Sequence, residues 1–126
     1  MTKPILCLDF DGVLHCYTSG WKGADVITDP PVPGMLTFLL SVIDEFDVCI
    51  LSSRSHQPGG ISAMKAWLKS HAGNSWYDSP AGRGLENITF PTIKPPAMVT
   101  IDDRALTFTG VFPSVSQLKS FKPWNK

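Results

Sequence analysis

The sequence predicts an α/β fold, in which a three-layer, Rossmann-like parallel sheet carries helices on both faces. The first observation is a set of short runs that are almost entirely apolar, at 5–8, 47–51 and 97–101. Such runs are typical of strands buried on both faces. The second observation is that segments with apolar residues at helical spacing lie between these runs. Strands alternating with helices imply right-handed crossovers and therefore parallel strands.

The first half of the chain predicts one strand-helix-strand unit. The strand at 5–8 ends at Asp9, and the stretch 15–33 that follows has no sustained period and contains turn-forming residues. This pattern predicts a flap-like excursion, such as a hairpin, above the strand. Apolar residues at helical spacing behind a Pro-Gly pair predict a helix over 33–45, and the run at 47–51 is the next strand.

The second half predicts further elements of both kinds. Apolar residues on one face predict a helix over 61–72, which a glycine ends. Short apolar stretches predict strands at 85–90 and 97–101, and an alternating stretch predicts an edge strand at 105–109. A capping-box pattern that opens at Ser114 predicts a last helix.

Length and composition restrict the class of protein. A chain of 126 residues predicts a single domain, 1–126. Lys and Arg together number 11, as do Asp and Glu, so the net charge favours neither nucleic acid nor a membrane surface as a partner. The three cysteines lack the spacing of a zinc site or a disulfide framework, and Cys7 and Cys49 fall in predicted buried strands. Without a leader-like or membrane-spanning run, we expect a cytoplasmic protein and no membrane partner.

Polar side chains follow three of the predicted strands. They are Asp9 and Asp11 after the first strand, Ser52, Ser53 and Arg54 after the second, and Asp102 and Asp103 after the fourth. Because the carboxyl ends of parallel strands meet at one edge of the sheet, we expect these side chains to share one crevice. Lys94 precedes its strand, so its side chain must reach the crevice from a loop. For the first pair alone, a solvated acidic turn or a calcium loop remains an alternative.

Several carboxylates in one crevice predict a bound cation. They repel one another, and burial without a partner is costly for each of them. A donor set of oxygens without His or Cys favours a hard ion. A few carboxylates, completed by water and a phosphate group, suit Mg²⁺ better than Ca²⁺.

Together these residues resemble the motifs of the haloacid dehalogenase-like (HAD) phosphohydrolase superfamily. The motif Asp-x-Asp-x-(Thr or Val) is matched by 9–13, the Ser or Thr after a strand by Ser52, and the Lys by Lys94. The family's final acidic pair is matched by 102–103. Family members usually carry a cap domain after the first motif or after the third strand, and both gaps are too short for one here. The resemblance therefore implies a small, capless HAD-like domain, with 15–33 in the place of the family's flap.

The resemblance also implies an activity, namely a Mg²⁺-dependent phosphatase that hydrolyses a phosphomonoester through an aspartyl-phosphate. Asp9 would be the nucleophile and a metal ligand, and Asp11 would transfer protons and bind the metal through its carbonyl oxygen. Asp102 would complete the metal site, with Asp103 beside it. Lys94 would neutralise the transferred phosphoryl group.

Substrate recognition is less defined by the sequence. The Ser52 hydroxyl and the loop with Ser53 would bind the phosphoryl group, and Arg54 is expected to clamp a second substrate group, with a surface ion pair as the alternative. His15 and His56 are expected to be loop residues. Trp21 and Lys22 either lean over the site or belong to a solvent-exposed loop. Without a cap, the site suits a bulky phosphorylated partner such as a nucleotide, a nucleic-acid end or a phosphoprotein, and the oligomeric state is left open.

Two other classes share parts of this pattern. A receiver-like signalling domain also uses an acidic pair, a Ser or Thr and a Lys, but its phosphorylated Asp lies alone on a later strand. Here the pair Asp102–Asp103 instead follows Lys94. A phosphate- or metal-binding module without phosphatase turnover is the second alternative.

Overall fold

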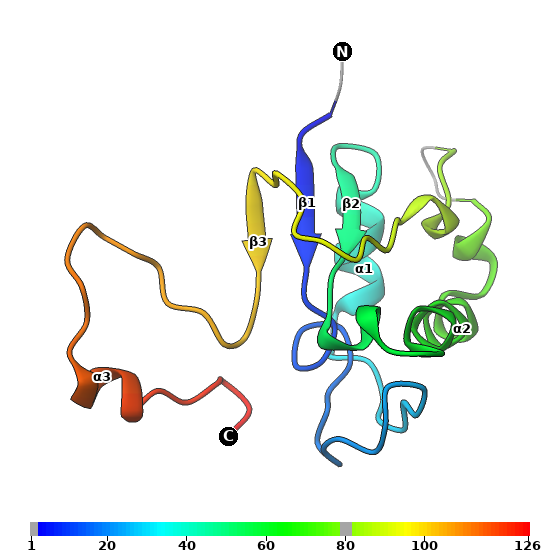
Figure 1. Cartoon of the computed structure of the whole chain (residues 1–126). Helices are drawn as coiled ribbons and strands as arrows, with labels where there is room; N and C mark the ends of the chain where they lie inside the picture. Colours follow the sequence, from blue (N-terminus) through cyan, green and yellow to red (C-terminus); the bar gives the residue numbers. More distant parts are fainter. Residues whose placement is uncertain (1–2, 79–81) are drawn as a thin grey trace.

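The structure is a computed structural model that describes residues 3–78 and 82–126 (Figure 1). Within these residues, three parallel strands form one open sheet in the order β2-β1-β3. β1 (Ile5–Leu8) is central, between β2 (Asp47–Ile50) and β3 (Val99–Ile101). The parallel sheet with its helices confirms the predicted α/β class.

Two helices follow the first two strands. α1 (Met35–Val42) lies between β1 and β2 in the chain, and α2 (Gly60–Ala72) comes after β2. α1 is shorter than the predicted helix, because the amides of Glu45 and Phe46 both bond to the Val42 carbonyl in a closing turn. Of the helices in the described part of the chain, none combines the length and the apolar character needed to cross a bilayer.

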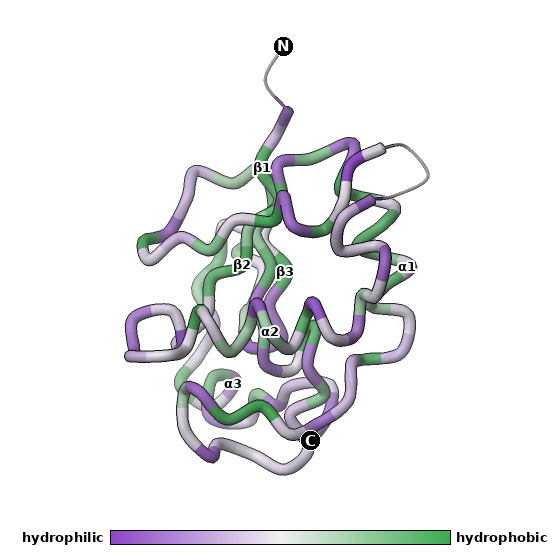
Figure 2. Tube along the Cα trace, turned by 90° about the vertical axis from the view of Figure 1, so that its right-hand side faces the viewer, coloured by the Kyte–Doolittle hydropathy of each residue, from purple (hydrophilic) through white to green (hydrophobic). Residues whose placement is uncertain are grey.

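The core lies where the sheet meets these helices. Completely buried side chains come from β1, β2, α1, the turn after it and α2, namely Leu8, Ile50, Leu39, Ile43, Met64 and Leu68. The tube in Figure 2 is coloured as hydrophobic along much of β1 and β2. Burial on this scale is the main force that holds the strands side by side, and it fixes their carboxyl ends at one edge.

Two predicted strands are wrong. Residues 85–90 form the short 3-10 helix η3 (Leu85–Asn87) and then a single parallel bridge, in which Thr89 pairs with Cys49 of β2. The Leu85 side chain turns fully into the core, which a short helical turn permits. Residues 105–109 have no strand beside them and remain irregular, since an alternating pattern cannot supply a pairing partner. With the bridge included, the order across the sheet is the segment at Thr89, then β2, β1 and β3.

The excursion at 15–33 is a loop whose two ends lie side by side. His15 and Pro31 form an antiparallel bridge. The Cys16 amide donates to Pro30 O at 3.0 Å, and the Val32 amide donates to Leu14 O at 2.8 Å. The loop therefore rises from the carboxyl end of β1 and returns to the same place.

The chain leaves the body after β3 and returns near its end, as Figure 1 shows in orange and red. We call residues 104–121 the C-terminal arch. It contains α3 (Val115–Lys119), whose capping box between Ser114 and Gln117 confirms the predicted last helix. The return is held by Trp124, whose Nε1–H donates to Gly12 O at 2.7 Å, and by Asn125, whose amide donates to Cys16 O at 3.2 Å.

Candidate metal and phosphate site

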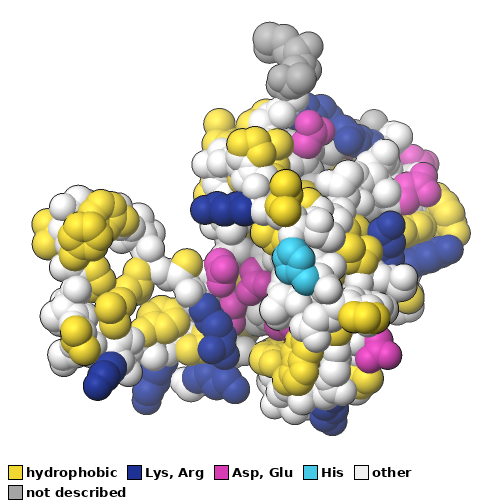
Figure 3. Space-filling view, in the orientation of Figure 1, with side chains coloured by type: hydrophobic (Ala, Val, Ile, Leu, Met, Phe, Trp, Pro, Cys, Tyr) yellow, Lys and Arg dark blue, Asp and Glu magenta, His cyan; other side chains and the backbone are white. Residues whose placement is uncertain are grey.

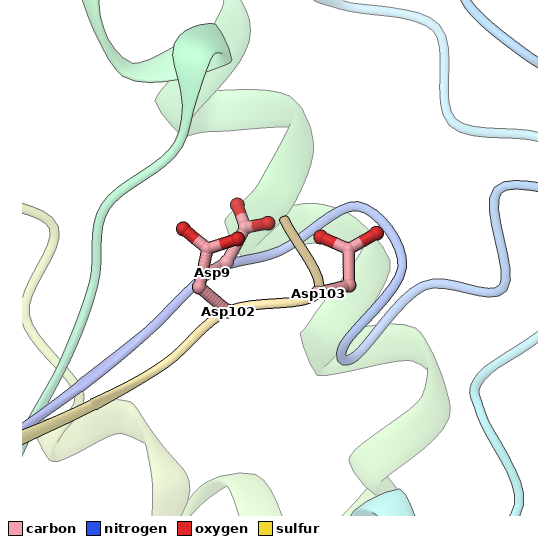
Figure 4. A group of neighbouring side chains, drawn as sticks. All are labelled: Asp9, Asp102 and Asp103. Carbon is pink, nitrogen blue, oxygen red and sulfur yellow. The ribbon is translucent and has the colours of Figure 1, made fainter. Parts of the chain in front are cut away.

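Three of the predicted carboxylates lie together at the carboxyl ends of β1 and β3. The Asp9 amide donates to Ile101 O at 2.9 Å, which continues the β1–β3 pairing to the point where both strands end. Asp102 and Asp103 follow immediately. One carboxylate oxygen from each of the three lies within 4.8 Å of the others (Figure 4). Parallel pairing thus joins residues that are far apart in the sequence.

This place is the topological switch point of the sheet. The chain moves outward from β1 to β2 and the Thr89 bridge, and then returns to the opposite side of β1 as β3. In open α/β sheets, ligands bind outside the carboxyl ends of the strands at such a reversal. The three carboxylates occupy that position.

The electrostatics of the cluster favour a cation. Burial, the hydrogen bond with Asp103 and the charges of Asp102 and Asp103 raise the pKa of Asp9 to about 8. Asp103 Oδ1 is buried without a hydrogen-bond partner among the described residues. An unpartnered buried oxygen and a carboxylate that resists ionisation both indicate uncompensated negative charge. The residues therefore fit a hard divalent ion, which would supply that charge.

Gly12 allows the close approach of Asp103 to the first loop. Its φ of +84° lies in the left-handed region, and a Cβ at this position would overlap the Asp103 carboxylate. The carbonyl of Gly12 accepts the Trp124 hydrogen bond described above. Gly12, Asp102, Asp103 and Trp124 line a hollow of about 220 Å³ beside the cluster.

The Asp11 carboxylate is held by two basic side chains. The Arg54 Nε–H donates to Asp11 Oδ2 at 2.9 Å, and His15 Nδ1 lies 2.9 Å from Asp11 Oδ1. Burial alone would raise the pKa of Asp11, but the hydrogen bonds from His15 and Arg54, together with the charge of Arg54, lower it below its usual value. Asp11 is therefore held in the ionised form.

The hydrogen bonds of His15 define its tautomer. The Asp29 amide donates to His15 Nε2 at 3.0 Å, so Nε2 is an acceptor and the proton lies on Nδ1, which donates to Asp11. His15 is almost fully buried, and its ring stacks on Phe10 with centroids 5.6 Å apart. The sequence alone predicts a loop residue at this position, without a contact to the acidic residues. Its spacing of four from Asp11, directly after a tight turn, was the available signal.

Arg54 is not placed as a substrate clamp. Its side chain is 0% exposed, and its Nη1 donates to the carbonyl oxygens of Gly23, Ala24 and Val26 at 2.8, 2.9 and 3.1 Å. The Trp21 ring lies against it, with the guanidinium carbon 4.7 Å from the ring centroid. The predicted substrate contact is therefore wrong for this structure. The excursion folds over the guanidinium, and its backbone carbonyl oxygens accept the Nη1 hydrogen bonds.

The remaining predicted residues have mixed positions. The buried Ser52 caps the 3-10 helix η1 (Ser53–His56), with its Oγ accepting from the Arg54 amide at 3.1 Å, while Ser53 and His56 are exposed. Lys94 is exposed and, in residues 3–78 and 82–126, makes no ion pair with the three carboxylates. The structure thus forms two groups from the predicted residues, the acidic cluster and the Asp11–Arg54 pair. Lys94 belongs to neither group.

Comparison of the chain with known protein families, with curated proteins and with solved structures finds no match.

Proposed function

We propose that the protein is a Mg²⁺-dependent phosphatase of the HAD-like type, with the three-layer fold of that class, which hydrolyses a phosphomonoester through an aspartyl-phosphate. The observation that supports it most is the meeting of Asp9, Asp102 and Asp103 within 4.8 Å at the switch point of a parallel sheet. The order of motifs along the chain adds to this support. Asp9, Asp102 and the Asp11 carbonyl would hold Mg²⁺, whose charge neutralises the phosphoryl group during transfer.

In the first step, a carboxylate oxygen of Asp9 attacks phosphorus, and the bond from phosphorus to the ester oxygen breaks. The leaving oxygen takes a proton from the site or departs as an anion. In the second step, Asp11 accepts a proton from water as that water attacks the phosphorus of the aspartyl-phosphate, which restores Asp9 and releases phosphate. The ionised state of Asp11 supports this second role, because only the carboxylate can accept the proton.

Positive charge for the transferred group comes from Lys94 in this proposal. Lys94 lies in a loop that leads through Pro95 and Pro96 to β3, and a rotation of its exposed side chain is the movement that the proposal requires. Arg54 instead positions Asp11. The substrate is a phosphorylated molecule that reaches the cluster from the exposed side of Asp102.

One observation favours a second candidate function, metal binding without phosphatase turnover. The cluster has carboxylates enough for a cation, whereas Lys94 makes no ion pair with it in the described part of the chain. A binding module needs only the cluster. The two functions differ in whether phosphate is released.

The test is phosphate release from p-nitrophenyl phosphate and from 3′- and 5′-phosphorylated oligonucleotides, with Mg²⁺ or with EDTA. We expect turnover with Mg²⁺, none with EDTA, and none for Asp9→Asn. Asp44→Asn is the matched control, since Asp44 precedes β2 at the opposite edge of the sheet. Mg²⁺ binding without phosphate release from any ester supports the second function, and turnover in EDTA contradicts both.

A further inference from the structure

The C-terminal arch is an apolar segment without a covering surface. Every residue from 104 to 120 is exposed. The stretch nevertheless carries six large apolar side chains, each more than half exposed, namely Leu106, Phe108, Val111, Phe112, Val115 and Leu118. A monomeric soluble protein rarely leaves such a contiguous patch in water, and larger patches mark interaction sites.

The arch forms a groove of its own. Its volume is about 560 Å³, and all of its lining residues lie between Leu106 and Leu118. Phe108 and Phe112 pack against each other there, with ring centroids 4.9 Å apart. The body of the same chain contributes no lining residue among those described. The groove is therefore shaped but not filled by its own chain.

The strand that precedes the arch, β3, also has exposed apolar side chains. Val99 and Ile101 of β3 are 48% and 38% exposed, although strands of a parallel sheet are normally covered. Within the described residues, β3 pairs only with β1, so its other edge presents unpaired backbone groups. An edge of this kind is a template for association unless something covers it.

The arch is held away from this strand at both of its ends. It starts at Arg104, directly after the acidic pair that follows β3, and beyond its other end Trp124 and Asn125 are hydrogen-bonded to the segment after β1. Figure 3 shows the part between these anchors standing apart from the body, with hydrophobic side chains gathered on it. Its apolar side chains are thus presented as a surface.

The surface that this chain exposes beyond that of a compact monomer is large enough for one side of a stable dimer interface. A compact monomer of 13.8 kDa exposes about 6,600 Å², and the 7704 Å² of this chain exceeds that by about 1,100 Å². A stable protein interface buries about 800 Å² on each partner. The excess of one chain thus corresponds to one side of such an interface.

We propose that two copies of this chain associate through these surfaces, with the arch of each copy packed over the bare β3 of the other. The arrangement uses both apolar surfaces of both copies and closes with two-fold symmetry. The formal net charge is zero at pH 7, so repulsion between copies does not oppose it. The dimer does not depend on the proposed phosphatase activity.

The test is the mass of the 126-residue protein in solution. It is measured by sedimentation velocity and by light scattering from about 1 to about 200 µM, because standard-sized interfaces have dissociation constants from micromolar to picomolar. We expect twice the 13.8 kDa chain mass for the wild type. The variant Phe108→Asp/Phe112→Asp should be a monomer with an unchanged far-UV circular dichroism spectrum, because both side chains are exposed within the single chain.

The matched control is Tyr77→Asp, which places one such carboxylate on another exposed aromatic residue, after α2 in the chain and outside the arch. It should remain a dimer. A monomeric wild type at about 200 µM, as expected if the arch closes on its own β3, overturns the proposal, because interfaces of about this area have dissociation constants in the micromolar range or below. A dimer that the arch variant leaves intact also overturns it.

Discussion

The guanidinium of Arg54 and the carboxylate of Asp11 form a buried ion pair, with Nε 2.9 Å from Oδ2, although 43 positions separate them in the chain. The pair connects the loop after β2 to the loop after β1. Through the three carbonyl oxygens bound by Nη1, it also connects both loops to the excursion. Asp11 and the excursion are therefore both bound by the side chain of Arg54.

Replacing this arginine tests the connection through stability. Arg54→Met should lower the free energy of unfolding by about 3–5 kcal/mol, because it takes away the charged partner of the Asp11 carboxylate and the donor of the loop carbonyls. Urea denaturation measures the change. Arg104→Met, at an exposed position just after the acidic pair, is the control and should change stability by less than about 0.5 kcal/mol. A loss for Arg54→Met no larger than that of the control would contradict the buried pair.

The raised pKa of Asp9 predicts an unusual pH dependence of stability without metal. Between pH 4 and 8 the folded protein holds a proton on Asp9 that the unfolded chain has lost, since the folded pKa is about 8 and the ordinary value is 3.8. The free energy of unfolding should therefore fall as pH rises through this window. Thermal melts in EDTA from pH 5 to 8 measure it.

Asp9→Asn should remove this part of the pH dependence, because the amide does not titrate. Mg²⁺ should raise the melting temperature of the wild type more at pH 8 than at pH 6, since it competes with the proton for Asp9. Equal slopes for wild type and Asp9→Asn in EDTA would show that Asp9 is not the group responsible.

A comparison of alanine variants at Gly12 and Gly20 distinguishes the cost of backbone strain from the cost of a steric overlap. Both have a left-handed φ, +84° and +76°, but only Gly12 has Asp103 in the space of a Cβ. Gly20→Ala should cost about 1 kcal/mol, whereas Gly12→Ala should cost about 2–4 kcal/mol because it adds the overlap to the strain. Gly12→Ala should also weaken Mg²⁺ binding in calorimetry. Equal costs for the two variants would indicate that Asp103 does not approach Gly12 as described.

The lowered pKa of Asp11 predicts a preference among phosphate esters. An ionised Asp11 is a weak proton donor, so esters with good leaving groups should react faster by roughly 10²-fold or more than alkyl esters. Steady-state rates for p-nitrophenyl and alkyl phosphates at pH 7 measure the ratio. Similar rates for both would mean that another group protonates the leaving oxygen.

Local patterns are enough to predict the strands β1, β2 and β3 and the helices α1, α2 and α3. The parallel order of those strands was enough to predict that Asp9 would meet Asp102 and Asp103. The apolar stretch at 85–90 does not form the predicted strand, because its composition does not show whether a pairing partner lies beside it. Arg54 was misread for a related reason, since its burial depends on how the excursion folds over it and not on its own neighbours in the chain.

The most direct test of the phosphatase proposal is the intact mass of the protein after rapid acid quench during turnover of p-nitrophenyl phosphate with Mg²⁺. Asp11→Asn should accumulate a species heavier by one phosphoryl group, because the second step slows by roughly 10²–10⁴-fold without its base. Fragmentation should place that group on Asp9. Asp9→Asn should show no added mass. Turnover without added mass in wild type and Asp11→Asn, or a phosphoryl group on a residue other than Asp9, would contradict the aspartyl-phosphate route.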